Sequence, residues 1–198
     1  NKSFLSQYTK SKTEFKDIAF SGNGEPTASK QFKDVISILI EKINEYKLDK
    51  IIIRLITNGS YMANPETQDA LSLLSNFKRE VWFKIDQTNK EGVKTINQVS
   101  LSTSSVKKNL EAALNNNPTV IQTCLFKLNK KLPSSESLDN YIDFIKPYSD
   151  KIKEIHLYSL ARPSEQTNEA KLTRLTESEL EAIAGRIKVL NIPIQIFP

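Results

Sequence analysis

The chain alternates short apolar runs with longer segments in which hydrophobic residues recur every three or four positions. The apolar runs are rich in β-branched residues and show little alternation, which is typical of strands covered on both faces of a parallel sheet. The longer segments have one apolar and one charged face, as amphipathic helices do. The predicted strands are 18–20, 50–57, 81–86, 119–126, 152–160 and 194–197, and the predicted helices are 32–45, 65–77, 104–115, 135–148 and 176–190.

This pattern predicts an α/β fold in which six parallel strands alternate with five helices. The last helix has a recognisable start, because Thr176 is followed three residues later by Glu179 as a capping box. Residues 87–105 and 161–173 show no clear periodicity and are predicted to be long loops. A doubly wound open sheet and a barrel or partial barrel both fit, and periodicity alone does not separate them.

The segment after the first strand, Ser21 to Thr27, is the main candidate for ligand binding. Gly22 and Gly24 lack a Cβ atom, so they can adopt unusual backbone angles and expose main-chain groups to a small molecule. Glu25 precedes a proline and is therefore biased toward an extended conformation. A tight Asn-Gly hairpin turn is the competing interpretation, but a helix follows this segment rather than a second strand.

Further polar side chains stand where the next predicted strands end. Thr57 and Asn58 end the second strand, and Lys84 and Asp86 end the third. In both candidate folds the loops at the C-terminal ends of parallel strands gather on one side, where ligands bind. We therefore expect these side chains to lie near the glycine segment.

Length and composition favour one globular domain, residues 1–198, without a membrane span or secretory signal, and hence a cytoplasmic protein. The chain begins at Asn1 and its only methionine is Met62, so we expect a first strand and loop upstream of Asn1. The net charge is +5, and two small clusters of lysine residues could contact RNA. We interpret them as solvated faces, because no aromatic residues interleave with them to stack bases.

The sequence lacks the residues that other common catalytic and metal-binding sites require. His156 is the only histidine and lies in an apolar strand, which favours a structural role over a catalytic triad. The sequence has neither a phosphate-binding loop nor the third glycine of a dinucleotide fingerprint, and it has no zinc-ligand spacing. Cys124 is the only cysteine, and its place in the middle of a strand is typical of a small buried apolar residue.

Four segments at predicted strand ends carry distinctive motifs. They are residues 20–27 (Phe-Ser-Gly-Asn-Gly-Glu-Pro-Thr), 56–60 (Ile-Thr-Asn-Gly-Ser), 81–86 (Val-Trp-Phe-Lys-Ile-Asp) and 157–163 (Leu-Tyr-Ser-Leu-Ala-Arg-Pro). The first resembles the Gly-Gly-Glu segment of the radical S-adenosylmethionine enzymes, and the other three resemble later strand ends of that superfamily in the same order. The group that includes wyosine-type tRNA base synthases and related iron–sulfur oxidoreductases is the most similar in these motifs. The resemblance implies a partial (β/α)6 TIM-like barrel.

The resemblance also implies S-adenosylmethionine as cofactor. By analogy, backbone at Gly22, Asn23, Gly24 and Glu25 would bind the cofactor's amino group. Thr57, Asn58, Lys84 and Asp86 would meet its carboxylate, its ribose or the substrate, and Gln122 would contact the ribose. Arg162 would hold an anionic group of the substrate.

The chain departs from the family in its cysteines. Family members bind a [4Fe-4S] cluster through a Cys-x-x-x-Cys-x-x-Cys loop, and one cysteine cannot supply those ligands. We therefore expect no catalytic or metal-ligating residue within this chain, and cluster ligands upstream of Asn1. The first hypothesis is an enzyme that, with this cluster and a reductant such as flavodoxin or ferredoxin, cleaves the cofactor to a 5′-deoxyadenosyl radical acting on an unknown substrate. The second is a non-catalytic ligand-binding or interaction domain on a degenerate barrel.

Overall fold

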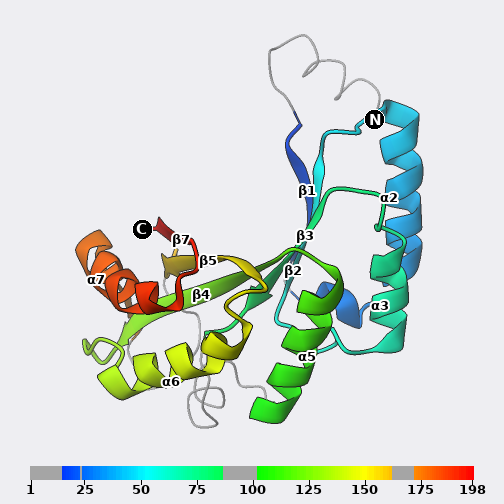
Figure 1. Cartoon of the computed structure of the whole chain (residues 1–198). Helices are drawn as coiled ribbons and strands as arrows, with labels where there is room; N and C mark the ends of the chain where they lie inside the picture. Colours follow the sequence, from blue (N-terminus) through cyan, green and yellow to red (C-terminus); the bar gives the residue numbers. More distant parts are fainter. Residues whose placement is uncertain (1–14, 23, 87–101, 162–171) are drawn as a thin grey trace.

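The computed structural model describes residues 15–22, 24–86, 102–161 and 172–198. These residues form an α/β structure whose elements alternate as the sequence predicts (Figure 1). The strands are β1 (Asp17–Phe20), β2 (Ile52–Thr57), β3 (Arg79–Lys84), β4 (Thr119–Leu128), β5 (Ile152–Ser159), β6 (Leu172–Arg174) and β7 (Ile194–Phe197). The α-helices are α2 (Phe32–Tyr46), α3 (Pro65–Ser72), α5 (Thr103–Asn116), α6 (Ser135–Ile145) and α7 (Glu177–Ile187). Short 3₁₀ turns are η1 (Pro26–Ala28), η2 (Lys146–Tyr148) and η3 (Lys188–Leu190).

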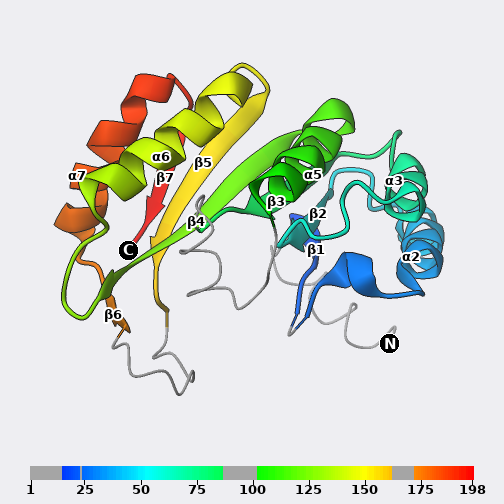
Figure 2. The same cartoon turned by 90° about the horizontal axis from the view of Figure 1, so that it is seen from below.

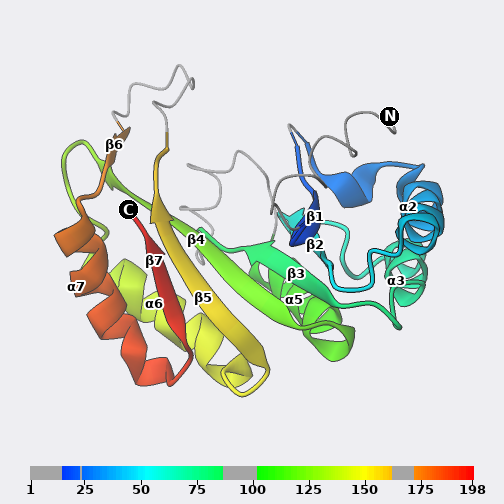
Figure 3. The same cartoon turned by 90° about the horizontal axis from the view of Figure 1, so that it is seen from above.

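The main sheet is parallel and its strands follow one another in sequence order, β1-β2-β3-β4-β5-β7. A doubly wound sheet reverses its strand order at a switch point and carries helices on both faces. Here the order does not reverse, and the five α-helices of the described residues cover one face of a curved sheet (Figures 2 and 3). The fold is therefore a partial TIM-like barrel, with its helices outside and its concave face within.

The hydrophobic core lies between the sheet and the helices. Alternate strand residues such as Leu55, Phe83 and Leu157 face the helix layer and are almost fully buried. The helices contribute side chains such as Ile36 and Leu110, which are also fully buried. Burying an aliphatic or aromatic side chain of this size contributes on the order of 1.5–3 kcal/mol. This layer therefore provides the stability that holds the strand ends in register.

The concave face carries charge near the N-terminal ends of the strands. The buried carboxylate of Glu80 accepts hydrogen bonds from Arg54 Nε at 3.0 Å and Trp82 Nε1 at 3.1 Å, and it forms an ion pair with Lys153. Arg54 also pairs with Asp17. Burial alone would raise the pKa of Glu80, but the hydrogen bonds from Lys153, Arg54 and Trp82 hold its pKa below the ordinary value.

Local end signals decide where the helices start and stop. The predicted capping box of α7 is confirmed, because Thr176 accepts from the Glu179 N–H while the Glu179 carboxylate accepts from the Thr176 N–H. The prediction that the second helix continues to residue 77 was wrong. Helix α3 ends at Ser72, and turn-type bonds from Leu73 to Ala70 and from Phe77 to Leu74 replace the helical pattern.

The expectation of a loop throughout residues 161–173 was also wrong in part. Strand β6 begins at Leu172 and pairs antiparallel with the end of β4. A three-residue strand is too short to show a period, and its partner lies more than forty residues away in the sequence. Among the described helices, none combines the length and the apolar character that crossing a bilayer requires.

Candidate functional site

The loops after β1 and β2 are joined through the side chain of Glu25. Its Oε1 accepts a hydrogen bond from the Thr57 hydroxyl at 2.7 Å and one from the Thr27 N–H at 3.2 Å. Its Oε2 accepts from the backbone N–H of Asn58 at 2.7 Å. Three residues predicted from the sequence, Glu25, Thr57 and Asn58, are thus brought together at the C-terminal edge of the sheet. The carboxylate of Glu25 acts there as a link between two loops.

The turn that follows β2 is fixed by its own contacts. The buried hydroxyl of Thr57 accepts from the Gly59 N–H at 2.9 Å while it donates to Glu25. Gly59 has a φ of 81°, and a Cβ atom there would lie 2.1 Å from Cζ of Phe83. The Asn58 side chain accepts from the backbone and the hydroxyl of Ser60, at 2.9 and 2.7 Å. Only glycine fits position 59, so the turn geometry is set by the residue type.

Gly22 and Gly24 are exposed and stand beside this link. Neither has a φ in the left-handed region, so the unusual backbone angles that the sequence allowed are not adopted. A Cβ atom on either residue would meet no protein atom within 4 Å. Neither backbone strain nor packing against the described residues requires glycine at these two positions. Asn23, predicted to belong to the same edge, lies outside the described residues.

The concave face holds a cavity of about 470 Å³ at the C-terminal half of the strands. Lys84 and Gln122, which are register neighbours on β3 and β4, line it as predicted site residues. Tyr158 from β5 and Arg174 from β6 also line it, and the sequence pattern did not single out either of them. Arg162, predicted to contact the substrate, lies outside the described residues.

One wall of this cavity is aromatic. The ring of His156 is 5.0 Å from that of Trp82 and 5.0 Å from that of Phe197, and both contacts are edge-to-face. Nε2 of His156 lies 3.1 Å from a carboxylate oxygen of Glu154. The sequence pattern favours a structural role for His156, and the structure adds that it lines the cavity. The alternation of Glu154, His156 and Tyr158 along β5 is the signal that could have identified this polar inner face.

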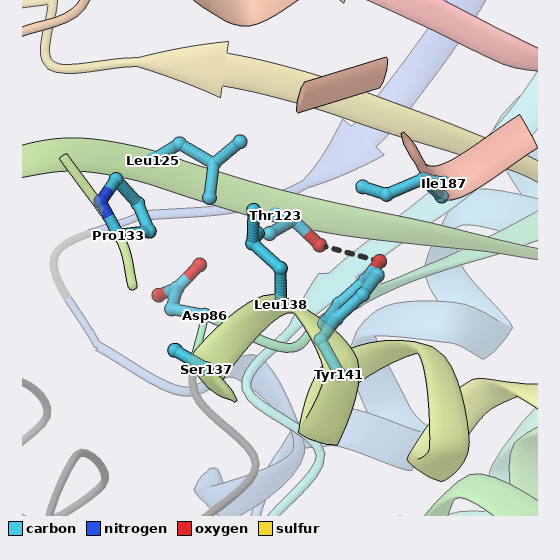
Figure 4. A pocket seen from close by; sticks show the side chains of 8 residues that line it. All are labelled: Asp86, Thr123, Leu125, Pro133, Ser137, Leu138, Tyr141 and Ile187. Carbon is cyan, nitrogen blue, oxygen red and sulfur yellow. Dashed lines mark hydrogen bonds between the residues drawn. The ribbon is translucent and has the colours of Figure 1, made fainter. Parts of the chain in front are cut away.

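Asp86 lies at a different place from Lys84. It lines a separate small cavity of about 20 Å³ together with Thr123, Ser137 and Tyr141, near the start of α6 (Figure 4). Its Oδ1 accepts the Cys124 N–H at 2.9 Å, and the Thr123 and Tyr141 hydroxyls hydrogen-bond at 2.9 Å. Burial raises the pKa of Asp86, while the nearby positive charge of Lys84 and the bond from Cys124 oppose this effect. Lys84 ends β3 and Asp86 follows it, and the two side chains line different cavities.

Cys124 is half-buried, and burial together with the charge of Asp86 raises the pKa of its thiol to about 12. A thiol with this pKa remains protonated at neutral pH and is a poor metal ligand. In the described part of the chain, no three His, Cys, Asp or Glu side chains are grouped as a metal site requires. These residues therefore do not fit a four-iron cluster.

No protein-family model and no curated protein matches the sequence. The structure is similar to a domain of pyruvate-formate lyase-activating enzyme from Bacteroides vulgatus, with a TM-score of 0.62 and 14% identity over 92% of this chain and 99% of that domain. It is also similar to a radical SAM methyltransferase from Sphaerobacter thermophilus, with a TM-score of 0.61, 10% identity and 98% coverage of this chain, which spans 54% of that protein. At such low identity, what the chain shares with these two proteins is the fold of its partial barrel.

Proposed function

We propose that this chain is the S-adenosylmethionine-binding core of a radical S-adenosylmethionine enzyme. The observation that carries the proposal is the link from Glu25 to Thr57 and Asn58, which holds the exposed backbone of Gly22 and Gly24 at the C-terminal edge of the barrel. The sequence of this segment resembles the amino-binding segment of that superfamily. The named fold neighbours, an activating enzyme and a radical SAM methyltransferase, support the same superfamily.

Several of the predicted residues have a binding role that their chemistry suits. Main-chain carbonyls near Gly22 and Gly24 would accept hydrogen bonds from the cofactor's ammonium group, with no side chain to prevent the approach. Lys84, at the cavity wall, would pair with its carboxylate, and the neighbouring Gln122 would bind the ribose hydroxyls. Glu25 would position the loop rather than contact the ligand, because its two oxygens already accept hydrogen bonds from both loops.

The described residues do not fit a [4Fe-4S] cluster, because Cys124 is the only cysteine of the chain and its thiol stays protonated. We therefore assign to these residues the binding and orientation of the cofactor. Its reductive cleavage would require cluster ligands from outside residues 1–198.

Calorimetric titration of the chain with S-adenosylmethionine tests the binding role. We expect saturable binding, and we expect Gly24→Ala to raise Kd about tenfold while leaving the free energy of unfolding nearly unchanged. The matched control is Gly185→Ala in α7, where an added Cβ also meets nothing within 4 Å but which lies far from the site in sequence. Absence of binding by the unmodified chain, or equal affinity of Gly24→Ala, would contradict the proposal.

The alternative hypothesis is a non-catalytic ligand-binding or interaction domain on a degenerate barrel. Anaerobic reconstitution of the full-length protein with iron and sulfide, followed by reduction with dithionite or flavodoxin, distinguishes the enzyme from the binding domain. Release of 5′-deoxyadenosine from S-adenosylmethionine supports the enzyme. Cofactor binding without iron uptake or cleavage supports the binding domain.

A further inference from the structure

We infer that the part of the large cavity lined by Trp82, His156, Tyr158, Arg174 and Phe197 binds an anionic small molecule that carries a planar ring. That this molecule is the substrate rests on the proposed function. Three features of the cavity support binding at this site: its aromatic wall, the sign of its charges and its size.

The aromatic wall suits a flat ring. His156 lies between Trp82 and Phe197, with each ring centroid 5.0 Å from its own and with edge-to-face geometry. The His156 ring is buried, so the accessible ring surface of this wall comes from Trp82 and Phe197. Phe197 is 46% exposed although it lines the cavity. An aromatic side chain left open to solvent inside a concave site gains by stacking on a ligand ring. The wall therefore offers both shape and apolar area to a planar ligand.

The charges select an anion. Lys84 and Arg174 line the cavity, and neither makes a salt bridge with another described residue. Because Lys84 is assigned to the carboxylate of the proposed cofactor, Arg174 is the cation that remains for a second ligand. No described residue that lines the cavity is acidic. The nearest carboxylate on β5, that of Glu154, is already within hydrogen-bond distance of His156. The carboxylate of Asp86 lines a separate cavity but interacts electrostatically with Lys84, so the charge-assisted hydrogen bond that this wall offers an anionic group comes from Arg174.

Tyr158 adds a neutral donor beside these cations. Burial, and to a lesser extent the charge of Asp86, raises the pKa of Tyr158, so its hydroxyl keeps its proton at neutral pH. A protonated phenol can donate a hydrogen bond to a carboxylate or phosphate oxygen. Arg174 and Tyr158 come from neighbouring parts of the same wall, because β6 pairs with β4 and β4 pairs with β5.

This part of the cavity suits the proposed cofactor poorly. S-adenosylmethionine carries a positive sulfonium and a positive ammonium against one carboxylate, so its net charge opposes Arg174. We place the cofactor between the loops after β1 and β2, where Glu25, Thr57 and Asn58 lie, and the side chains of Lys84 and Gln122 on β3 and β4. The volume of about 470 Å³ is within the range of roughly 300–1,000 Å³ that is usual for small-molecule sites.

The chain contains a single tryptophan, Trp82, and it stands in the wall of the cavity. Its fluorescence therefore reports on the surroundings of this wall, without a signal from any other tryptophan. We would titrate the protein without S-adenosylmethionine using adenosine 5′-monophosphate and 4-hydroxybenzoate as planar anions, adenosine as the ring alone, and ribose 5-phosphate as the anion alone. Saturable quenching by at least one planar anion, with binding at least about tenfold weaker for both adenosine and ribose 5-phosphate, is the expected result. Comparing the quenching by adenosine 5′-monophosphate with that by 4-hydroxybenzoate then shows which of the two planar anions binds more tightly.

Two substitutions connect that signal to the inferred contacts. Arg174→Gln should weaken binding of the planar anion about tenfold, and Phe197→Leu should weaken it severalfold, while Lys33→Gln on the outer surface of α2 should change nothing. Equal binding of adenosine, no binding of either planar anion, or unchanged affinity in Arg174→Gln would overturn the inference. Gly24→Ala should leave the planar-anion signal intact, and Arg174→Gln should leave S-adenosylmethionine affinity intact. A failure of one proposal is therefore distinguishable from a failure of the other.

Discussion

The carboxylate of Glu25 accepts a hydrogen bond from the hydroxyl of Thr57 at 2.7 Å and thereby ties the loop after β1 to the end of β2. Thirty-two positions separate these residues in the sequence. The bond is charge-assisted and half-buried, so it is stronger than a typical surface contact. It is also the contact on which the geometry of the proposed cofactor edge depends.

Removing this link should destabilise the protein. Glu25→Ala leaves the buried Thr57 hydroxyl and the Asn58 N–H without their acceptor, and we expect a loss of about 1–3 kcal/mol in the free energy of unfolding. Urea denaturation followed by circular dichroism measures it. Glu181→Ala, on the exposed face of α7, is the control and should change stability by less than about 0.5 kcal/mol. Equal stability of the two variants would show that the link carries little energy.

The turn at Gly59 should tolerate no side chain. An alanine there would need a φ near 81° and would place its Cβ 2.1 Å from the ring of Phe83, which is itself buried in the core. Strain and overpacking together should cost at least about 2 kcal/mol, lowering the thermal midpoint. Gly185→Ala, inside α7 with open space around the new Cβ, should be neutral or stabilising by about 0.5–1 kcal/mol. A stable Gly59→Ala variant would mean that the turn can rearrange.

Glu80 should make stability depend on pH on the acid side. Its pKa is lower in the folded protein than its ordinary value of 4.5, so its contribution is fully present above that value and is lost as the pH falls through the folded-state pKa. We predict that the unmodified protein loses more unfolding free energy between about pH 6 and about pH 3 than Glu80→Gln does. Urea titrations at several pH values give the unfolding free energy as a function of pH for the unmodified protein and for Glu80→Gln, with Glu181→Gln as control. The same dependence on pH in the unmodified protein and in Glu80→Gln would contradict the ion network on the concave face.

Asp86 should make the free energy of unfolding depend on pH in the opposite direction. Burial raises its pKa above the ordinary value of 3.8, so it costs stability increasingly as the pH rises from that value through the folded-state pKa. Asp86→Asn keeps an oxygen acceptor for the Cys124 N–H but carries no charge, and we expect equal or higher stability at neutral pH. Asp86→Ala removes the acceptor and should lose about 1–2 kcal/mol. A strongly destabilised Asp86→Asn would show that the carboxylate charge itself stabilises the fold.

Much of the fold could be predicted from local pattern. All six predicted parallel strands and all five helices are present, because the apolar period and signals such as the Thr176 capping box act within a few residues. Strand β6 was missed and α3 was predicted too long. A three-residue edge strand has no period, and the turns after Ser72 keep apolar residues buried without helical spacing.

The candidate site was predicted less completely. Glu25, Thr57 and Asn58 were expected near one another as polar residues at neighbouring strand ends, and they meet. The aromatic wall was not foreseen, because the apolar neighbours of His156 on β5 suggested a core position. Those neighbours, Ile155 and Leu157, face the helices, whereas His156 faces the concave side with Trp82 and Phe197. The alternation of side chains along one strand could indicate that the strand has two faces. It could not indicate which other strands would place their aromatic rings on the same face of the sheet.

The order of the predicted strands and helices, the residue types at each strand end and the presence of one cysteine, too few for a four-iron cluster, follow from the sequence alone. The pairing of the strands in consecutive order, the position of the described helices on one face and the cationic, aromatic cavity on the concave face arise from tertiary contacts. The reason is the range of the forces involved. Periodicity and capping act over a few residues, whereas strand order, curvature and the surroundings of a side chain arise from contacts between segments distant in the chain.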